Sequence, residues 1–120
     1  MTRTILIVDD EPGVLRMLGL LLRESGCQVT MVSTAEAALA CMETLHPDLV
    51  LTDVRLPGMD GIELTHRIRS DTDLRDTAVV LMSAYGRPPR SEEDEFVPKP
   101  FDIDKLLDIV EEHAHAVHPR

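Results

Sequence analysis

The chain has 120 residues, 43% hydrophobic and 28% charged, with 12 basic and 22 acidic residues and a formal net charge of -10. This length and composition predict one globular domain, residues 1–120, with a single core. The negative charge argues against a nucleic-acid surface, and three aromatic residues give no platform for stacking bases. No apolar stretch is long enough to span a membrane and the N-terminus does not resemble a signal peptide, so we expect a cytoplasmic protein.

Short apolar runs alternate with helical patterns along the whole chain. This alternation predicts repeated βαβ units and therefore an α/β fold with a parallel sheet. The expected strands lie at about residues 4–8, 28–32, 48–52, 78–82 and 96–98.

The expected helices begin and end at recognisable signals. Pro12 suits the first turn of the first helix, and Gly26 ends it. A capping box, Ser33-Thr34-Ala35-Glu36, opens the second helix, whose apolar face extends to Leu45 before Pro47. Asp60 and Glu63 cap a third helix that continues to about Ser70.

The segment between the fourth and fifth strands breaks the alternation. Residues 86–95 contain no apolar residue, so no helix can pack on a sheet there. The acidic run Glu92-Glu93-Asp94-Glu95 is expected to be a solvated loop. The fifth strand must lie at a sheet edge because it contains Pro98, and Asp102 caps the last helix.

Polar residues follow four of the expected strands. Asp9 and Asp10 follow the first, Asp53 the third, Ser83 the fourth and Lys99 the fifth. Because the carboxyl ends of parallel strands share one edge of a sheet, these groups should meet there. Adjacent carboxylates repel by roughly 4 kcal/mol per pair at an effective dielectric of about 20. The cluster therefore predicts a bound divalent cation and phosphoryl chemistry.

Together these residues resemble the receiver domain of bacterial response regulators, the chemotaxis-type module of two-component signalling. The matching segments are Val8-Asp9-Asp10-Glu11, Leu51-Thr52-Asp53, Leu56-Pro57-Gly58-Met59-Asp60-Gly61, Met82-Ser83-Ala84 and Lys99-Pro100-Phe101. Each is weak alone, but five in the right order and strand context are specific. The resemblance implies a doubly wound, flavodoxin-like sheet of five parallel strands in the order 2-1-3-4-5. In this chain the fourth helix of the family should be short or absent.

The resemblance also implies the chemistry of the site. Asp53 would be the phosphoacceptor, and Lys99 and Ser83 would bind phosphoryl oxygens. The cofactor would be Mg²⁺, with Mn²⁺ as an alternative. Its ligands would be Asp10, Asp53, the backbone carbonyl of Arg55 and, through water, Asp9.

Further residues are expected to transmit or time the signal. Ser83 and Phe96 would form the switch, with phenylalanine where the family more often has tyrosine or histidine. Arg55 and Tyr85 occupy positions that tune the lifetime of the acyl phosphate. The bond between Lys99 and Pro100 is commonly cis in the family.

The leading interpretation is a signalling module in a two-component system or phosphorelay. It is not an enzyme, beyond promoting its own phosphorylation and dephosphorylation. Its partners would be a histidine kinase or histidine phosphotransfer protein and a downstream protein target, with no direct contact to nucleic acid or membrane. The shortened segment should expose apolar surface of the sheet or the third helix, where we expect a homodimer or partner contact.

Two alternatives remain open. One is a receiver that is never phosphorylated and serves as a scaffold, although such proteins typically lose an acid or the lysine. The other is a phosphatase of the haloacid dehalogenase type. That class needs a second acid two residues after its nucleophile, where this chain has Arg55.

Overall fold

Five parallel strands form the centre of the structure, a computed structural model that describes residues 2–114. The strands are β1 (Thr4–Val8), β2 (Gln28–Val32), β3 (Leu49–Asp53), β4 (Ala78–Ser83) and β5 (Glu95–Pro98). They lie in the order β2-β1-β3-β4-β5, so the predicted order is confirmed. Since β5 is an edge strand, the missing N–H of Pro98 leaves no gap inside the sheet.

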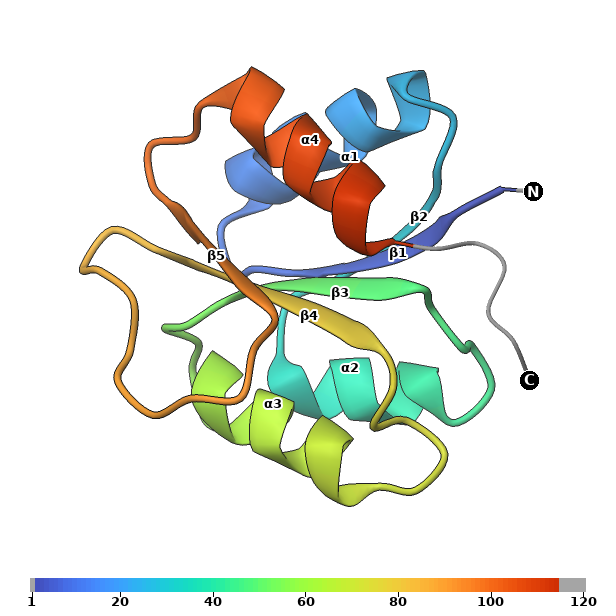
Figure 1. The fold of residues 1–120 in the computed structure, drawn as a ribbon, viewed down its shortest axis with the longest axis vertical. Helices are drawn as coiled ribbons and strands as arrows, with labels where there is room; N and C mark the ends of the chain where they lie inside the picture. Colours follow the sequence, from blue (N-terminus) through green and yellow to red (C-terminus); the bar gives the residue numbers. More distant parts are fainter. Residues whose placement is uncertain (1, 115–120) are drawn as a thin grey trace.

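Helices cover both faces of the sheet (Figure 1). One face carries α1 (Pro12–Glu24) and α4 (Ile103–His113), and the other carries α2 (Ala35–Met42) and α3 (Gly61–Ser70). Successive strand residues point to opposite faces. Ile5 and Ile7 therefore enter the core beneath α1 and α4, whereas Leu6 and Val8 enter the core beneath α2 and α3. Among the described residues no helix has the length and apolar character needed to cross a membrane.

The start of α2 differs from the predicted capping box. Thr34, not Ser33, is the N-cap, and its hydroxyl accepts a hydrogen bond of 3.0 Å from the Ala37 amide. Glu36 is then the second helical residue rather than the third, too early to reach back to the N-cap amide. Its carboxylate accepts a hydrogen bond from the Met59 amide instead, at 3.1 Å.

The end of α2 also differs from the prediction. The helix ends at Met42, three residues before the expected Leu45. The amides of Glu43 and Thr44 bond to carbonyls only three residues back, which tightens the last turn ahead of Pro47.

The β4–β5 loop, residues 84–94, replaces a helix, as predicted: within the described chain no helix lies between β4 and β5. Figure 1 shows this loop descending from the sheet edge and running beside α3 before it returns to β5. Of the two apolar surfaces expected to be exposed here, the sheet is covered, because β4 is buried from Val79 to Ser83, whereas α3 exposes Ile62, which is 36% exposed.

The acidic run is only partly solvated, which modifies the sequence interpretation: Glu92 and Asp94 are exposed, but the Glu93 side chain is buried. Each of its four acids lies within 4.0 Å of a cationic or titratable nitrogen. The pairs are Glu92 with His66 (2.8 Å), Glu93 with Arg87 (2.8 Å), Asp94 with Arg69 (2.6 Å), and Glu95 with Arg87 (3.9 Å) and His113 (3.8 Å). The pairs of Glu92 and Asp94 therefore attach the β4–β5 loop to α3, whereas Arg87 pairs with Glu93 inside the loop and with Glu95 at the start of β5.

Arg69 is the centre of this attachment. Its guanidinium bonds the Asp94 carboxylate and donates to the backbone carbonyls of Arg75, Thr77 and Glu92. Its side chain is only 18% exposed. The same Asp94 carboxylate accepts a hydrogen bond of 2.7 Å from the Val79 amide, so α3, β4 and the loop are joined at one point.

Replacing Arg69 should therefore destabilise the fold. We expect Arg69→Ala to lower the free energy of unfolding by about 2 kcal/mol, because four acceptors, of which the Thr77 carbonyl is part-buried, lose their donor at once. Urea unfolding measures the change. Arg75→Ala is the matched control, since among residues 2–114 that side chain has no recorded hydrogen bond or ion pair, and it should stay within about 0.5 kcal/mol of the parent. Equal losses in the two variants would contradict this account.

The His66–Glu92 pair should be visible by titration. The hydrogen bond that the His66 imidazole donates to the Glu92 carboxylate raises the pKa of His66 above its usual 6.5. The stabilising effect of this pair is then complete below pH 6.5 and is lost as the pH rises through the higher folded-state pKa. NMR titration of His66 should show a lower pKa in Glu92→Gln, with Glu112→Gln as a charge-matched control on α4. An unchanged His66 pKa in Glu92→Gln would disprove the pairing.

Candidate functional site

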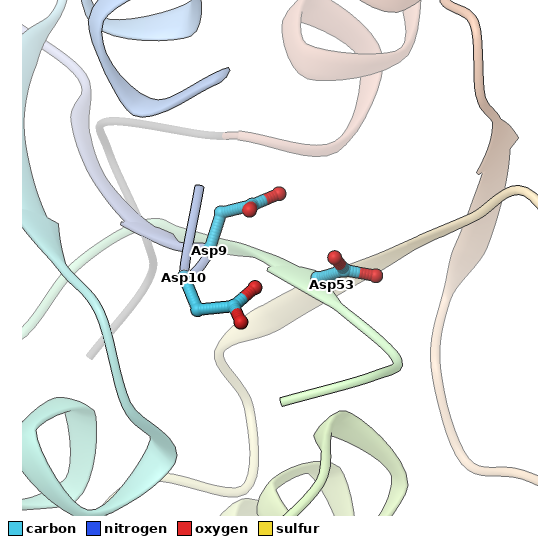
Figure 2. Close-up of side chains that lie close together, drawn as sticks. All are labelled: Asp9, Asp10 and Asp53. Atoms are coloured by element: carbon cyan, nitrogen blue, oxygen red, sulfur yellow. The ribbon is translucent and has the colours of Figure 1, made fainter. Parts of the chain in front are cut away.

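Three carboxylates meet where β1 and β3 end (Figure 2). The parallel register pairs Val8 with Thr52, so the next residues, Asp9 and Asp53, emerge side by side, and Asp10 follows. One ligand oxygen from each of the three acids lies within 4.8 Å of the others. Asp9 is fully buried, Asp53 is 7% exposed, and Asp10 is exposed. The predicted acid cluster is thus formed in the structure.

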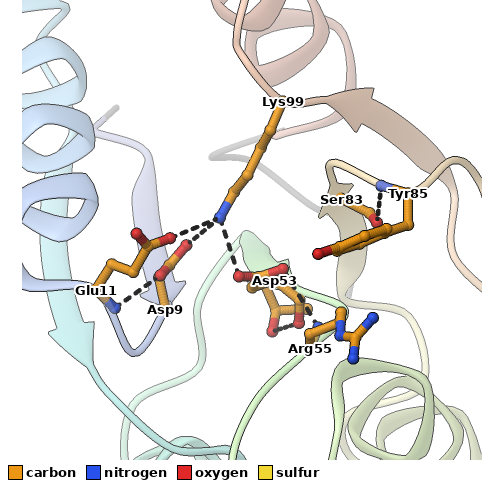
Figure 3. Close-up of polar contacts among 8 residues, drawn as sticks. Asp9, Glu11, Asp53, Arg55, Ser83, Tyr85 and Lys99 are labelled. Atoms are coloured by element: carbon orange, nitrogen blue, oxygen red, sulfur yellow. Dashed lines mark hydrogen bonds and ion pairs between the residues drawn. The ribbon is translucent and has the colours of Figure 1, made fainter.

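Lys99 brings the opposite charge to this edge. The Lys99 amide bonds to the Ser83 carbonyl at 3.0 Å, which extends the β4–β5 pairing beyond the strands. The Lys99 ammonium lies 2.9 Å from a carboxylate oxygen of Asp9 and 2.9 Å from one of Asp53 (Figure 3). Glu11 contributes a further oxygen at 3.7 Å, a contact that the sequence did not indicate. The bond between Lys99 and Pro100 is cis, as expected.

Burial and ion pairing act on the same groups in opposite directions. Burial raises the pKa of Asp9, and its hydrogen bonds from Lys99 and the Glu11 amide offset this effect only in part. Burial alone would lower the pKa of Lys99, but hydrogen bonds to Asp9 and Asp53 outweigh it and raise that pKa. The lysine is therefore held in its charged form beside Asp9, a carboxylate that burial makes costly to ionise.

The donor set fits a hard divalent cation. Each pair of carboxylates at most 4.8 Å apart repels by at least about 3 kcal/mol at an effective dielectric of about 20. One ammonium leaves two formal negative charges uncompensated. Mg²⁺ prefers oxygen ligands and keeps several bound waters, and the exposed carboxylate of Asp10 leaves room for them.

The two residues expected to switch, Ser83 and Phe96, are not bonded to the carboxylates. The Ser83 hydroxyl accepts a hydrogen bond of 2.9 Å from the Tyr85 amide, and within the described chain it records no bond to Asp53. Phe96 packs, partly buried, against the core beneath α2 and α3. The structure therefore places Ser83 at the end of β4, and Phe96 on β5 opposite Leu81, without linking either to the carboxylates.

Arg55 and Tyr85 meet beside the acids. The Arg55 guanidinium carbon lies 4.7 Å from the centre of the Tyr85 ring, which itself is 76% exposed. Both residues line a cavity of about 480 Å³ that extends to Ser83. The Arg55 amide donates to an Asp53 carboxylate oxygen at 3.3 Å (Figure 3). The two residues predicted to act on the site are thus adjacent to each other and to it.

Gly61 has a role that sequence reasoning missed. A β-carbon at this first residue of α3 would overlap the backbone carbonyl of Asp53, and the Gly61 amide donates to the Val54 carbonyl at 2.8 Å. Only glycine permits α3 to begin this close to Asp53. The available signal was a glycine directly after the helix cap Asp60.

Comparisons with known proteins are consistent with this geometry. The response regulator receiver domain family matches residues 5–111. Sporulation initiation phosphotransferase F of Bacillus subtilis is 36% identical over 120 residues, covering 94% of each chain. The regulatory protein AtoC of Escherichia coli is 39% identical over 113 residues, and the match covers 89% of this chain but 24% of that protein. Response regulator protein TrrA of Thermotoga maritima, solved in complex with Mg²⁺ and BeF, is 33% identical with a TM-score of 0.85, covering 92% of this chain and 98% of that one.

Divalent cations should stabilise this protein through the acid cluster. At a Mg²⁺ concentration ten times the Kd, we expect the free energy of unfolding to rise by about 1.4 kcal/mol. Asp10→Asn should be no less stable than the parent without metal, because it removes one repelling charge, but it should gain much less from Mg²⁺. Chemical unfolding with and without Mg²⁺ measures both effects. Asp73→Asn, an exposed acid outside the cluster, is the control, and an equal Mg²⁺ response in all three proteins would contradict the site.

Proposed function

The chain belongs to the response regulator receiver domain family, whose members act in signalling as phosphoacceptors, and from this premise we propose that Asp53 accepts the phosphoryl group here. The observation that carries the proposal is the Lys99 ammonium, 2.9 Å from the Asp53 carboxylate within a cluster of three acids. The donor would be the phosphohistidine of a histidine kinase or histidine phosphotransfer protein. The family match over residues 5–111 supports treating residues 1–120 as one receiver domain.

Phosphoryl transfer follows from the positions of these groups. A carboxylate oxygen of Asp53 attacks phosphorus, the bond between phosphorus and the donor imidazole nitrogen breaks, and that nitrogen keeps the electron pair. The product is an acyl phosphate on Asp53. Lys99 is close enough to exchange one carboxylate contact for a phosphoryl oxygen, as a compact charge with three donors.

We propose Mg²⁺ as the cofactor, with Mn²⁺ as an alternative. Asp10, Asp53 and the Arg55 carbonyl would bind it directly, and Asp9 through water. When bound, the cation neutralises charge on the phosphoryl oxygens and brings them toward the carboxylates. Support comes from the oxygen-only donor set and from the related TrrA, which was solved with Mg²⁺ and BeF.

The proposed switch requires one hydrogen bond to be exchanged for another. Ser83 would leave the Tyr85 amide and donate its hydroxyl to a phosphoryl oxygen, which carries more charge than any nearby acceptor. Phe96 would then rotate into the vacated space. Arg55 and Tyr85, which stack on each other and line the cavity, would shield the acyl phosphate from water and so set its lifetime.

The comparisons lend no support to the two alternatives. Arg55 occupies the position where a haloacid dehalogenase-type phosphatase needs its second acid, and the acids and lysine that scaffold receivers lose are present. The downstream target is proposed to be a protein rather than nucleic acid or membrane, and the location to be cytoplasmic. A homodimer or partner contact at the missing helix stays a proposal, which the exposed Ile62 of α3 supports and the buried β4 does not.

The test is modification by acetyl phosphate, or binding of beryllofluoride, in the presence of Mg²⁺. We expect one phosphoryl group per chain by mass spectrometry, and none on Asp53→Asn, which lacks the nucleophilic oxygen. Asp73→Asn, with the same change of charge at an exposed site, should react like the parent.

Other results would redirect the proposal. Steady turnover of phosphomonoesters would favour a phosphatase, and complete inertness of the parent would favour a scaffold. Modification that persists in Asp53→Asn would place the acceptor elsewhere.

A further inference from the structure

The β3–α3 loop, residues 54–60, carries the carbonyl expected to bind the metal. Its start is held firmly: the Val54 amide donates to the Met82 carbonyl at 2.9 Å, and the Val54 carbonyl accepts from Gly61 at 2.8 Å. At its end Asp60 caps α3 through the Glu63 amide at 2.8 Å. Between these anchors the chain must turn while Arg55 stays in place.

Glu36 holds the middle of this loop. Within the described part of the chain, residues 56–59 make a single hydrogen bond, which the Met59 amide donates to the Glu36 carboxylate at 3.1 Å. Leu56 and Met59 add partly buried apolar contacts with the core beneath α2 and α3. The directional restraint on the loop therefore comes from α2, 23 residues away in sequence.

Gly58 is shaped to admit this carboxylate. Its φ of +76° belongs to the left-handed region, and a β-carbon there would lie 2.9 Å from the Glu36 carboxylate oxygen. The backbone amides of Glu36 itself and of Met59 hold the pKa of this carboxyl below its usual value, so it stays charged at neutral pH. The glycine and the glutamate thus form one contact rather than two separate features.

We propose that Glu36 is a positioning residue for the metal site, fixing the loop that supplies the Arg55 carbonyl. The inference rests on the proposed function, because it assumes that a cation binds at Asp9, Asp10 and Asp53. A ligand on a loop binds more tightly when the loop is held in place before the ion arrives. Groups that orient metal ligands typically change metal affinity by about 10- to 100-fold when removed.

The experiment compares Mg²⁺ affinity in three variants, measured by NMR titration of backbone amides near Asp53. Glu36→Ala should weaken Mg²⁺ binding by about tenfold, the low end of the range for such groups. Glu36→Gln keeps an oxygen that can accept the Met59 amide and should bind almost as tightly as the parent. Glu43→Ala removes the same charge from the other end of α2 and should bind unchanged, which separates positioning from long-range electrostatics.

A double-mutant cycle with Gly58→Ala tests the contact directly. In the parent, the methyl group that Gly58→Ala adds contacts the Glu36 carboxylate and also strains the backbone at position 58. In the Glu36→Ala background the carboxylate is gone and only the backbone strain remains. The loss of Mg²⁺ affinity on Gly58→Ala should therefore be smaller in the Glu36→Ala background. Additive losses would overturn the inference.

Loss of the metal site and loss of the role of Glu36 give different results. If the parent does not bind Mg²⁺, the proposed function is overturned. If the parent binds Mg²⁺ and Glu36→Ala binds equally well, only the positioning role is overturned. A fall in thermal stability without a change in Mg²⁺ affinity would likewise assign Glu36 a purely structural role and refute the inference.

Discussion

Three carboxylates lie within 4.8 Å of one another at the ends of β1 and β3, and a single ammonium group offsets their charge. Burial makes the arrangement costlier, since it raises the pKa of Asp9 even with Lys99 bonded to it. A ligand that brings positive charge therefore stabilises this site most. A phosphoryl group can then bind at the same edge of the sheet. The fold serves this edge: β3 is buried along its length, and glycine at position 61 lets α3 start against Asp53.

The region that departs most from the family pattern is held by a different kind of force. A helix would pack on the sheet with apolar side chains, whereas the β4–β5 loop has none between Gly86 and Glu95. Arg69 and the paired acids replace that packing with directional bonds to α3 and β4. Added salt screens ion pairs of this kind, and a change of pH that neutralises one partner removes them, whereas apolar contacts are much less affected. The segment that follows Ser83 is therefore more sensitive to its surroundings than the rest of the fold.

Sequence reasoning succeeded where a feature depends on local spacing. The strand positions, the cap at Asp60 and the meeting of the acids with Lys99 all follow from periodicity and from the rule that parallel strands end at one edge. It failed where the deciding partner is distant in sequence. The acidic run, residues 92–95, was expected in solvent because its cationic partners on α3 are more than 20 residues away.

Residues 33–36 show, within one motif, what the sequence determines and what the tertiary structure decides. The sequence determined that a helix begins there, because both Ser33 and Thr34 can cap and acids favour a first turn. Only the tertiary structure decided which residue caps the helix. A shift of the cap by one position leaves Glu36 free to accept a hydrogen bond from the Met59 amide in the β3–α3 loop. The sequence alone likewise determined the sheet and its acid cluster, because alternation and strand ends are local properties. The contacts that hold the surrounding loops depend on which distant segments the fold brings together. The local sequence pattern does not encode that information.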